Sequence, residues 1–308
     1  MFKPLVTAVI PTRNRPELVL RAVRSALGQT YANLEVVVVV DGPDPSTVAA
    51  LEELRNPCVR IIALSENVGG SEARNIGARE ARGEWIALLD DDDEWLPEKL
   101  EKQIQSVLSS NGSILFSATQ YYDRQDGRVA TRPASFPGQN DHISEYLFCR
   151  LDRFGRRLTF LQTSTWVIRR DFLVEHPFTP RLQRNQDTDW LLRYFPLAAQ
   201  QSRFLAEPLA SFDACPNIQR ISTALDWEYT YSWATRNKDL FTSKAFAFFL
   251  ALVCGRDIAL QRAGIRALGK IWKSCSMRAR LLPQVQFCFG KRLAQHIVNT
   301  TRAAATQT

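Results

Sequence analysis

The sequence predicts an α/β protein: a doubly wound, mainly parallel sheet with helices on both faces, followed by a helical C-terminal extension. Three observations support this prediction. Short apolar, β-branched runs alternate four times with amphipathic helical segments in the first 110 residues, which is typical of successive β-then-α units. One of these runs is an almost unbroken row of valines, which is typical of a strand buried on both faces. From residue 225 onward, the apolar spacing is that of helices.

The four strand–helix units can be assigned in chain order. Strands are predicted at residues 5–10, 34–42, 59–64 and 84–90, and helices at 16–28, 44–55, 71–82 and 97–109. Proline stands in the first turn of two of these helices, and Gly28 suits a helix end. Asp44 or Ser46 is expected to cap the second helix, and Ser71 the third.

After residue 112 the pattern is mixed. We predict strands at 113–122 and 164–170, a short helix at 187–196, and further helices at 225–241, 243–264 and 265–282. The expected organisation is one domain over residues 1–222, with halves at 1–111 and 112–222, and a helical, basic extension over residues 223–308.

The positive charge is concentrated near the C-terminus. The formal net charge is +7, and the segment 256–302 contains ten Lys or Arg residues but a single acid, Asp257. The rest of the chain carries 29 basic and 31 acidic residues. Such asymmetry indicates a local anionic partner, either membrane phospholipid or nucleic acid.

Cysteine usage and hydropathy limit the protein class. Six scattered cysteines, none in a C-x-x-C pair, and three histidines give no zinc-site spacing, and are typical of reduced thiols in a cytoplasmic protein. The first ten residues do not resemble a signal peptide. The apolar run Ala245–Gly255 is about half the length that a membrane-spanning helix needs. We therefore do not expect a transmembrane protein.

Polar or small residues follow each of the four predicted strands. Because ligands of open α/β sheets bind beyond the carboxyl ends of the strands, these residues are expected at one binding edge. They are Pro11–Asn14, Asp41–Gly42, the glycine-rich stretch Glu66–Ala78, and the acidic run Asp90–Asp93.

The acidic run suggests a metal site. If the extended conformation continues past Leu89, Asp90 and Asp92 project to the same side. Paired carboxylates are suited to Mg²⁺ or Mn²⁺. The alternative is a solvated acidic loop ahead of a helix, but the position directly after a buried strand favours a ligand site.

The glycine-rich stretch matches neither the P-loop nor the G-x-G-x-x-G pattern, which counts against a P-loop enzyme and a dinucleotide-binding dehydrogenase. It is either a flexible turn into a helix or a place where Arg74 and the helix N-terminus hold an anion.

Four segments together resemble the inverting family 2 glycosyltransferases, which have the GT-A fold. They are VIPTRNRPELVLRAVRSALGQTY, LEVVVVVDG, NVGGSEARNIGAREARGEWIALLDDDDEWLPEKLEKQ and NQDTDWLLRY, and the likeness covers roughly residues 5–195. The resemblance implies a nucleotide-sugar-binding half over residues 1–111 and an acceptor-binding half over 112–222.

The resemblance also implies roles for the residues of the binding edge. Pro11 and Thr12 would line the nucleotide pocket, Asp41 would bind uracil or another base, and Arg74 would approach the nucleotide. The D-x-D element falls on Asp90, Asp91 and Asp92. Asp90 would face the ribose and Asp92, with Asp90, would hold the divalent metal, Mn²⁺ or Mg²⁺; Asp91 is grouped with the donor-binding residues.

The stretch QDTDW supplies the catalytic candidate. Asp187 matches the general base of the family and Arg193 matches a later arginine, whereas Gln186 stands where relatives often have Glu. Taken without the resemblance, the same stretch is more simply a helix N-cap. The resemblance further implies a histidine in the stretch 208–222, which has none.

The expected function is inverting transfer of a sugar from a nucleotide-diphospho-sugar, a UDP-sugar, to an acceptor hydroxyl on a glycan or lipid-linked acceptor. It would serve bacterial cell-surface polysaccharide or glycolipid assembly. The alternatives are a nucleotidyltransferase, which would need glycines in the loop PTRNRPE, and a non-catalytic sugar-nucleotide-binding protein.

The basic C-terminal segment has two interpretations. It can lie on an anionic membrane surface, where each Lys or Arg contributes about 1 kcal/mol, with Trp272, Phe287 and Phe289 as anchors. This would place a cytoplasmic enzyme at the cytoplasmic face of a membrane, with no nucleic-acid partner. Alternatively, the segment forms a helical subdomain or a dimer interface; the sequence does not indicate an oligomeric state.

Overall fold

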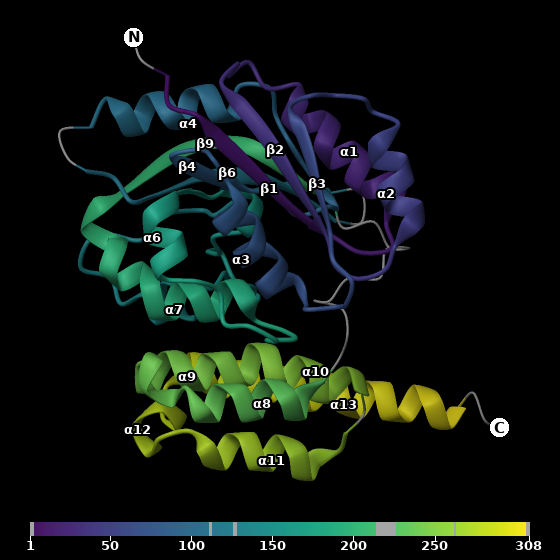
Figure 1. Cartoon of the computed structure of the whole chain (residues 1–308). Helices are drawn as coiled ribbons and strands as arrows, with labels where there is room; N and C mark the ends of the chain where they lie inside the picture. Colours follow the sequence, from purple (N-terminus) through teal and green to yellow (C-terminus); the bar gives the residue numbers. More distant parts are fainter. Residues whose placement is uncertain (1–2, 111–112, 126–127, 214–225, 262, 306–308) are drawn as a thin grey trace. The chain divides into compact units, whose positions relative to one another are not determined.

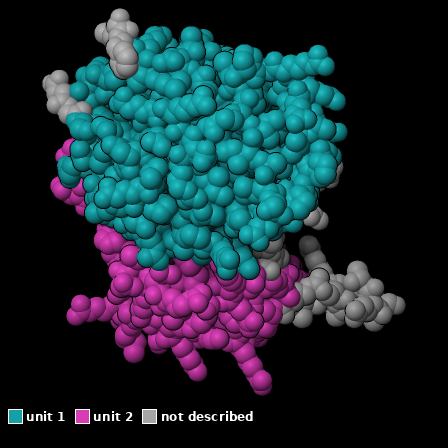
Figure 2. All heavy atoms as spheres, in the orientation of Figure 1, with its two compact units in different colours: residues 1–136, 161–218 teal, residues 137–160, 219–308 magenta. Residues whose placement is uncertain are grey.

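The computed structural model describes residues 3–110, 113–125, 128–213, 226–261 and 263–305. The chain divides into two compact units (Figure 2), residues 1–136 with 161–218, and residues 137–160 with 219–308. Residues 137–160, which the sequence analysis grouped with the 112–222 half, thus belong to the second unit.

The first unit is built on a nine-stranded sheet with the order β3-β2-β1-β4-β8-β6-β9-β5, in which β7 pairs with β6. The first four strands are parallel, as the alternating pattern predicts. They are β1 (Val6–Thr12), β2 (Leu34–Val40), β3 (Val59–Ala63) and β4 (Trp85–Leu88), connected by α1 (Pro16–Leu27), α2 (Pro45–Glu52) and α3 (Gly70–Glu80) (Figure 1).

The rest of the sheet is mixed. Strands β4 and β8, β8 and β6, and β5 and β9 pair antiparallel, whereas β6 and β9 pair parallel. The elements are β5 (Asp93–Trp95), α4 (Lys99–Leu108), β6 (Phe116–Gln125), β7 (Arg128–Arg132), β8 (Val167–Arg169), α6 (Arg170–Glu175), α7 (Gln186–Ala198) and β9 (Ser202–Asp213), with 3₁₀ turns at Thr163–Thr165 and Ala199–Gln201. Strands β5, β7 and β9 are absent from the sequence prediction.

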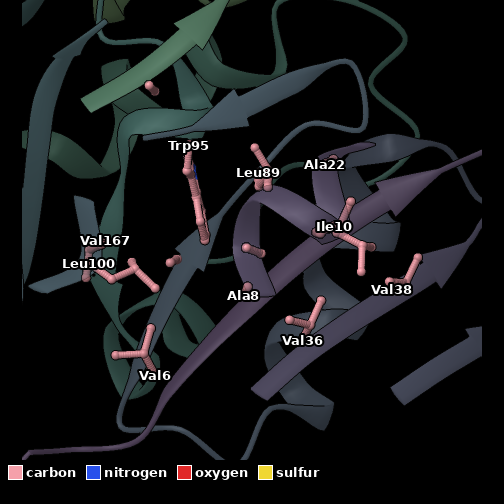
Figure 3. Packing of buried hydrophobic residues seen from close by; sticks show 14 of the residues in the cluster. Val6, Ala8, Ile10, Ala22, Val36, Val38, Leu89, Trp95, Leu100 and Val167 are labelled. Atoms are coloured by element: carbon pink, nitrogen blue, oxygen red, sulfur yellow. The ribbon is translucent and has the colours of Figure 1, made fainter. Parts of the chain in front are cut away.

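The valine run of β2 explains why helices cover both faces of the sheet. Val36 and Val38 pack in one apolar core with residues of α1, α2 and α4, several of which are shown in Figure 3. Val37 and Val39, which alternate with them, pack with Ala73 of α3 in a second cluster. Successive strand side chains point to opposite faces, so both faces of β2 are buried. The predicted fold class is confirmed.

The helix caps follow the sequence in one case and not in another. Asp44 caps α2, with its carboxylate accepting a hydrogen bond from the backbone N–H of Thr47 at 3.1 Å. The prediction of Ser71 as the cap of α3 is wrong: the cap is Gly69, whose φ of 85° needs a glycine, and the helix begins at Gly70.

The second unit is helical. Its elements are α5 (Ile143–Cys149), α8 (Trp227–Arg236), a 3₁₀ turn (Lys238–Leu240), α9 (Ser243–Phe249), a π-helical turn (Leu250–Cys254), α10 (Gly255–Gln261), α11 (Ile265–Ser274), α12 (Met277–Arg280) and α13 (Pro283–Ala305). Helix α9 packs against α5 through aromatic rings, with the ring centroids of Phe148 and Phe249 5.1 Å apart.

The longest apolar run of the sequence lies in the core of this unit. Nearly every side chain from Ala245 to Cys254 is buried in α9 and the π-helical turn. Within the described residues, no helix combines the length and hydropathy needed to cross a membrane. The five described cysteines are all free thiols.

Candidate active site

The acidic run begins with a tight turn. Strand β4 ends at Leu88, and the backbone N–H of Asp93 donates to the carbonyl of Asp90 at 3.1 Å. Asp93 then opens β5, which pairs with β9. The expectation that the extended conformation continues past Leu89 is therefore wrong, because the chain must turn to reach the far edge of the sheet. Strand alternation does not position Asp90 and Asp92.

Three arginines compensate the negative charge of this turn. Arg74 from α3 contacts Asp90 at 2.5 Å. Arg15, in the loop after β1, contacts Asp91 at 2.9 Å and Asp92 at 3.7 Å. Arg21 from α1 contacts Glu94 at 3.2 Å and donates to the carbonyl of Asp92 at 2.8 Å. Arg15 and Arg21 were not predicted from the sequence, although Arg15 stands in the loop PTRNRPE that follows the first strand.

Thr12 and Asp91 meet across the binding edge. The hydroxyl of Thr12 donates to Asp91 Oδ2 at 2.8 Å, over a separation of 79 residues. Burial of Asp91 raises the pKa of its carboxyl to about 6, while the Arg15 guanidinium acts in the opposite direction. Asp91 is thus a buried member of the site, in contact with the end of β1.

The side chain of Asp93 is buried and hydrogen-bonded within the protein. Its carboxylate accepts hydrogen bonds from Gln162 and from the hydroxyl of Ser164, the latter at 2.6 Å. The same Ser164 oxygen accepts from the backbone N–H of Asp90 at 3.0 Å. The segment just ahead of β8 therefore fixes the acidic turn at both of its ends.

Asp41 holds the glycine-rich loop. Its carboxylate accepts from the backbone N–H groups of Val68 at 2.7 Å and Gly69 at 3.0 Å, and its own N–H donates to the carbonyl of Thr12. Pro11 lies in β1, in register with Val39 of β2. The predicted residues Pro11, Thr12 and Asp41 are thus neighbours at the ends of β1 and β2.

Arg74 connects the acidic turn to α7. Its Nη2 contacts Asp90, and its Nη1 donates to Gln186 Oε1 at 2.7 Å, across 112 residues. The Gln186 amide in turn donates to the carbonyl of Leu182 at 2.7 Å. A Cβ on Gly70 would lie 3.3 Å from Gln186 Oε1 and 3.4 Å from Arg74 Nη1, so a small residue is favoured there.

Asp187 follows Gln186 directly and is half-buried in the first turn of α7. Its carboxylate accepts from the backbone N–H of Thr188 at 2.7 Å. The cap of α7 is Asn185, so the simpler interpretation of Asp187 as the N-cap is wrong. Arg193 donates to the buried Asp189 at 3.0 Å, one helical turn earlier.

The residues at the edge offer oxygen ligands for a hard cation. Within the described ranges, no group of three His, Cys, Asp or Glu side chains is arranged around a metal position. Mg²⁺ and Mn²⁺ in nucleotide sites, however, need only one or two carboxylates besides phosphate oxygens and water. Asp90 and Asp92 are two such carboxylates, paired in the structure with Arg74 and Arg15 respectively. The histidine-free stretch 208–222 lies largely outside the described residues.

The chain is similar to several curated bacterial proteins. It is 27% identical over 257 residues to the amylovoran biosynthesis glycosyltransferase AmsB of Erwinia amylovora, covering 78% of this chain and 82% of AmsB. It is 32% identical over 196 residues to the putative colanic acid biosynthesis glycosyl transferase WcaA of Escherichia coli, covering 62% and 66%. It is 30% identical over 149 residues to the Escherichia coli glucosyltransferase WfaP, covering 48% and 57%.

Solved structures with the same fold are more distant in sequence. Staphylococcus aureus TarS 1–349, in complex with UDP-GlcNAc, superposes with a TM-score of 0.64 at 17% identity, covering 95% of this chain and 89% of TarS. The mannosyltransferase PcManGT of Pyrobaculum calidifontis, in complex with GDP-Man and Mn²⁺, superposes with a TM-score of 0.56 at 17% identity, covering 98% and 87%.

The family assignment rests on the match over most of the first unit. The model of the family described as "Glycosyl transferase family 2" matches residues 7–176, more than half of the chain, and spans β1 to β4 and the acidic turn. The predicted family is confirmed: the chain belongs to glycosyl transferase family 2 and is a glycosyltransferase.

Proposed function

We propose that this glycosyltransferase moves a sugar from a UDP-sugar to an acceptor hydroxyl with inversion at the anomeric carbon, and that Asp187 is the general base. The observation that carries the proposal is the link through Arg74, which contacts Asp90 at 2.5 Å and Gln186 at 2.7 Å. Because Gln186 and Asp187 are consecutive, this link supports a position of the half-buried Asp187 close to the acidic turn.

The donor would bind along the ends of β1, β2 and β4. Asp41, already aligned by two backbone N–H groups, has lone pairs left to accept a hydrogen bond from the base. Pro11 and Thr12 would line the pocket, with Asp91 behind Thr12. Arg74 would approach the nucleotide from α3, and Arg15 offers a second guanidinium on the same side as Asp91 and Asp92.

Asp92 and Asp90 would hold Mn²⁺ or Mg²⁺. When bound, the metal supplies charge stabilisation for the diphosphate leaving group, a contribution of several kcal/mol. The PcManGT complex contains Mn²⁺ together with GDP-Man, which supports a divalent cation with this fold. The chain's own contribution is to position the carboxylates, and the arginines balance their charge until the donor binds.

The acceptor would be a glycan or lipid-linked sugar in bacterial polysaccharide or glycolipid assembly. The support is in the names of relatives: AmsB and WcaA are named for amylovoran and colanic acid biosynthesis, and WfaP for glucosyl transfer from UDP-Glc to an N-acetylglucosamine-diphosphoundecaprenol. Asp187 would take the proton of the acceptor hydroxyl as it attacks the anomeric carbon from the face opposite the nucleotide.

The test is nucleotide release from UDP-Glc, UDP-GlcNAc and GDP-Man, with and without Mn²⁺, followed by identification of the product anomer by NMR. Asp187→Asn is expected to lower turnover about 10²–10⁴-fold, the usual contribution of a positioned base, with an unchanged unfolding curve. Asp171→Asn, at an exposed carboxylate paired with Arg169, is the matched control and should keep full activity.

The same assay separates the alternatives. Full activity of Asp187→Asn would remove Asp187 as the base, and a product of retained configuration would exclude single displacement. Release of pyrophosphate from a nucleoside triphosphate and a sugar phosphate would instead identify a nucleotidyltransferase. Nucleotide-sugar binding without turnover for any acceptor would identify a non-catalytic binding protein.

A further inference from the structure

The second unit presents a surface in which cations and large apolar side chains alternate. The sequence has no acidic residue from Ile258 to Thr308. Helix α11 is amphipathic: Ala267, Leu268 and Ile271 are buried, whereas Lys270 and Lys273 are exposed. The exposed face of the folded helix α11 therefore carries positive charge only.

The cations of α11 line an open hollow. Its volume is about 580 Å³, and it is lined by Arg266, Gly269, Lys270, Lys273 and Ser274. The three basic residues recur at the i, i+4, i+7 spacing, so they stand in one row on the helix. No carboxylate lines this hollow. A row of cations lining an open depression matches the chemistry of phosphate-bearing headgroups.

Aromatic rings of α8 border the same row. The ammonium of Lys270 lies 4.9 Å from the ring centroid of Tyr231 and 5.6 Å from that of Trp227. The Tyr231 hydroxyl lies 2.8 Å from the hydroxyl of Ser274. Helices α8 and α11 are neighbours within this unit (Figure 1). Partly exposed Trp and Tyr rings beside lysine are the combination enriched at membrane–water interfaces.

Exposed apolar side chains precede and follow this row in the sequence. Ile265, at the first position of α11, is 61% exposed. Met277 in α12 and Leu281 just after it are each 68% exposed, one helical turn apart, with the basic Arg278 between them. Because these three large side chains are so exposed, they are not part of a hydrophobic core. Aliphatic side chains favour a lipid surface over nucleic acid, which is bound by cations and stacking aromatic rings.

We propose that this surface of α8, α11 and α12, which we call the α11 face, docks the enzyme on an anionic phospholipid membrane. The cations of α11 would contact lipid phosphates, and Ile265, Met277 and Leu281 would enter the boundary between headgroups and acyl chains. This inference depends on no step of the proposed sugar transfer.

The test is flotation of the full-length chain with vesicles of phosphatidylcholine alone, and with vesicles of phosphatidylcholine and phosphatidylglycerol in a two-to-one ratio, at low and high salt. The wild-type chain is expected to float with the anionic vesicles only, and less at high salt. Lys270→Glu with Lys273→Glu should lower the partition coefficient roughly 25-fold or more, since each basic residue near an anionic surface contributes about fivefold.

Two further variants make the result specific. Arg24→Glu with Arg128→Glu changes the net charge equally at exposed residues of the first unit and should leave flotation unchanged. Met277→Ser with Leu281→Ser removes apolar area without changing charge, and should lower partitioning about tenfold. All variants should unfold like the wild type, because the changed side chains are exposed.

Three outcomes would overturn the proposal. The first is no wild-type flotation on anionic vesicles, or equal flotation on neutral ones. The second is an equal loss in both charge-reversal pairs, which would assign binding to overall charge. The third is a wild-type dimer that Met277→Ser with Leu281→Ser converts to a monomer while flotation stays unchanged, which would identify the α11 face as a self-association surface.

Discussion

Lys99 is a fully buried cation in α4. Its ammonium donates to Gln103 Oε1 at 2.9 Å and lies 4.5 Å from the ring centroid of Trp95. Burial lowers the pKa of Lys99 from 10.5 to about 7, because the charged form loses its hydration. Below about pH 7 the Lys99 amine is charged in both the folded and the unfolded state, so burying this charge destabilises the fold by its full free-energy cost. Above the pKa of the unfolded state the amine is neutral in both states, and this cost is absent.

We therefore expect the stability gained by Lys99→Met, relative to wild type, to be largest at low pH. The free energy of unfolding of Lys99→Met minus that of wild type should decrease by roughly 2–3 kcal/mol from about pH 7 to about pH 9, since each pH unit in this window corresponds to about 1.4 kcal/mol. The loss of the Gln103 partner adds an offset that does not depend on pH. Urea unfolding at several pH values measures the difference, and a constant difference would show that Lys99 does not titrate in this range.

At the scale of elements, the contact between α3 and β1 depends on the absence of a side chain. A Cβ on Gly77, in the middle of α3, would lie 2.4 Å from Cγ1 of Val9 in the sheet. Gly77 thus lets the helix approach the sheet closely, although glycine in a helix interior is disfavoured by about 1 kcal/mol relative to alanine. Because α3 carries Arg74, this approach also sets the position of the guanidinium that links Asp90 to Gln186.

Gly77→Ala should lower the free energy of unfolding by about 1–3 kcal/mol, the usual cost of overpacking a dense core. Gly269→Ala in α11 is the matched control: nothing lies within 4 Å of its added Cβ, so the gain in helix propensity should stabilise the second unit by up to about 1 kcal/mol. Chemical unfolding followed by circular dichroism compares the two. Equal changes in the free energy of unfolding would mean that helix propensity, and not the close packing of α3 against β1, decides the effect of Gly77→Ala.

At the scale of the whole first unit, an aromatic cluster connects segments far apart in the chain. Trp190 of α7 is fully buried, and its ring centroid lies 5.3 Å from that of Trp166, 5.9 Å from that of Phe116 and 6.0 Å from that of Phe178. Its indole N–H donates to the carbonyl of His176 at 2.8 Å. The cluster anchors α7, and with it Asp187, against β6 and the segment before β8.

Trp190→Ala should cost about 3–5 kcal/mol of stability, as for other buried aromatic truncations. It should also reduce sugar transfer at temperatures where the protein stays folded, because α7 loses its anchor. Trp227→Ala, at a half-exposed tryptophan, should cost much less. Urea unfolding and nucleotide release on the same samples measure both effects; a loss below about 1 kcal/mol for Trp190→Ala would contradict the anchoring role.

Local patterns were sufficient to predict the β-then-α half of the fold and its binding edge. Valines at every position of β2 from Val36 to Val40 require burial on both faces, and the acids at 90–93 follow a buried strand whichever strands become its neighbours. The strand β5 could not be predicted, because Asp93 and Glu94 are poor strand formers and enter the sheet only by pairing with Phe212 and Ser211.

The sequence by itself determined the fold class and the position of the carboxylates at the ends of β2 and β4, because each depends on spacing within a few residues. Four matching segments carried the resemblance to the family. Only the tertiary structure decided that the run from Asp90 turns, that Arg15 and Arg74 are its counter-charges, and that residues 137–160 join the helical unit. Arg74 also reaches Gln186, 112 positions away along the chain. The geometry of these contacts follows from strand order and helix packing, which no local pattern encodes.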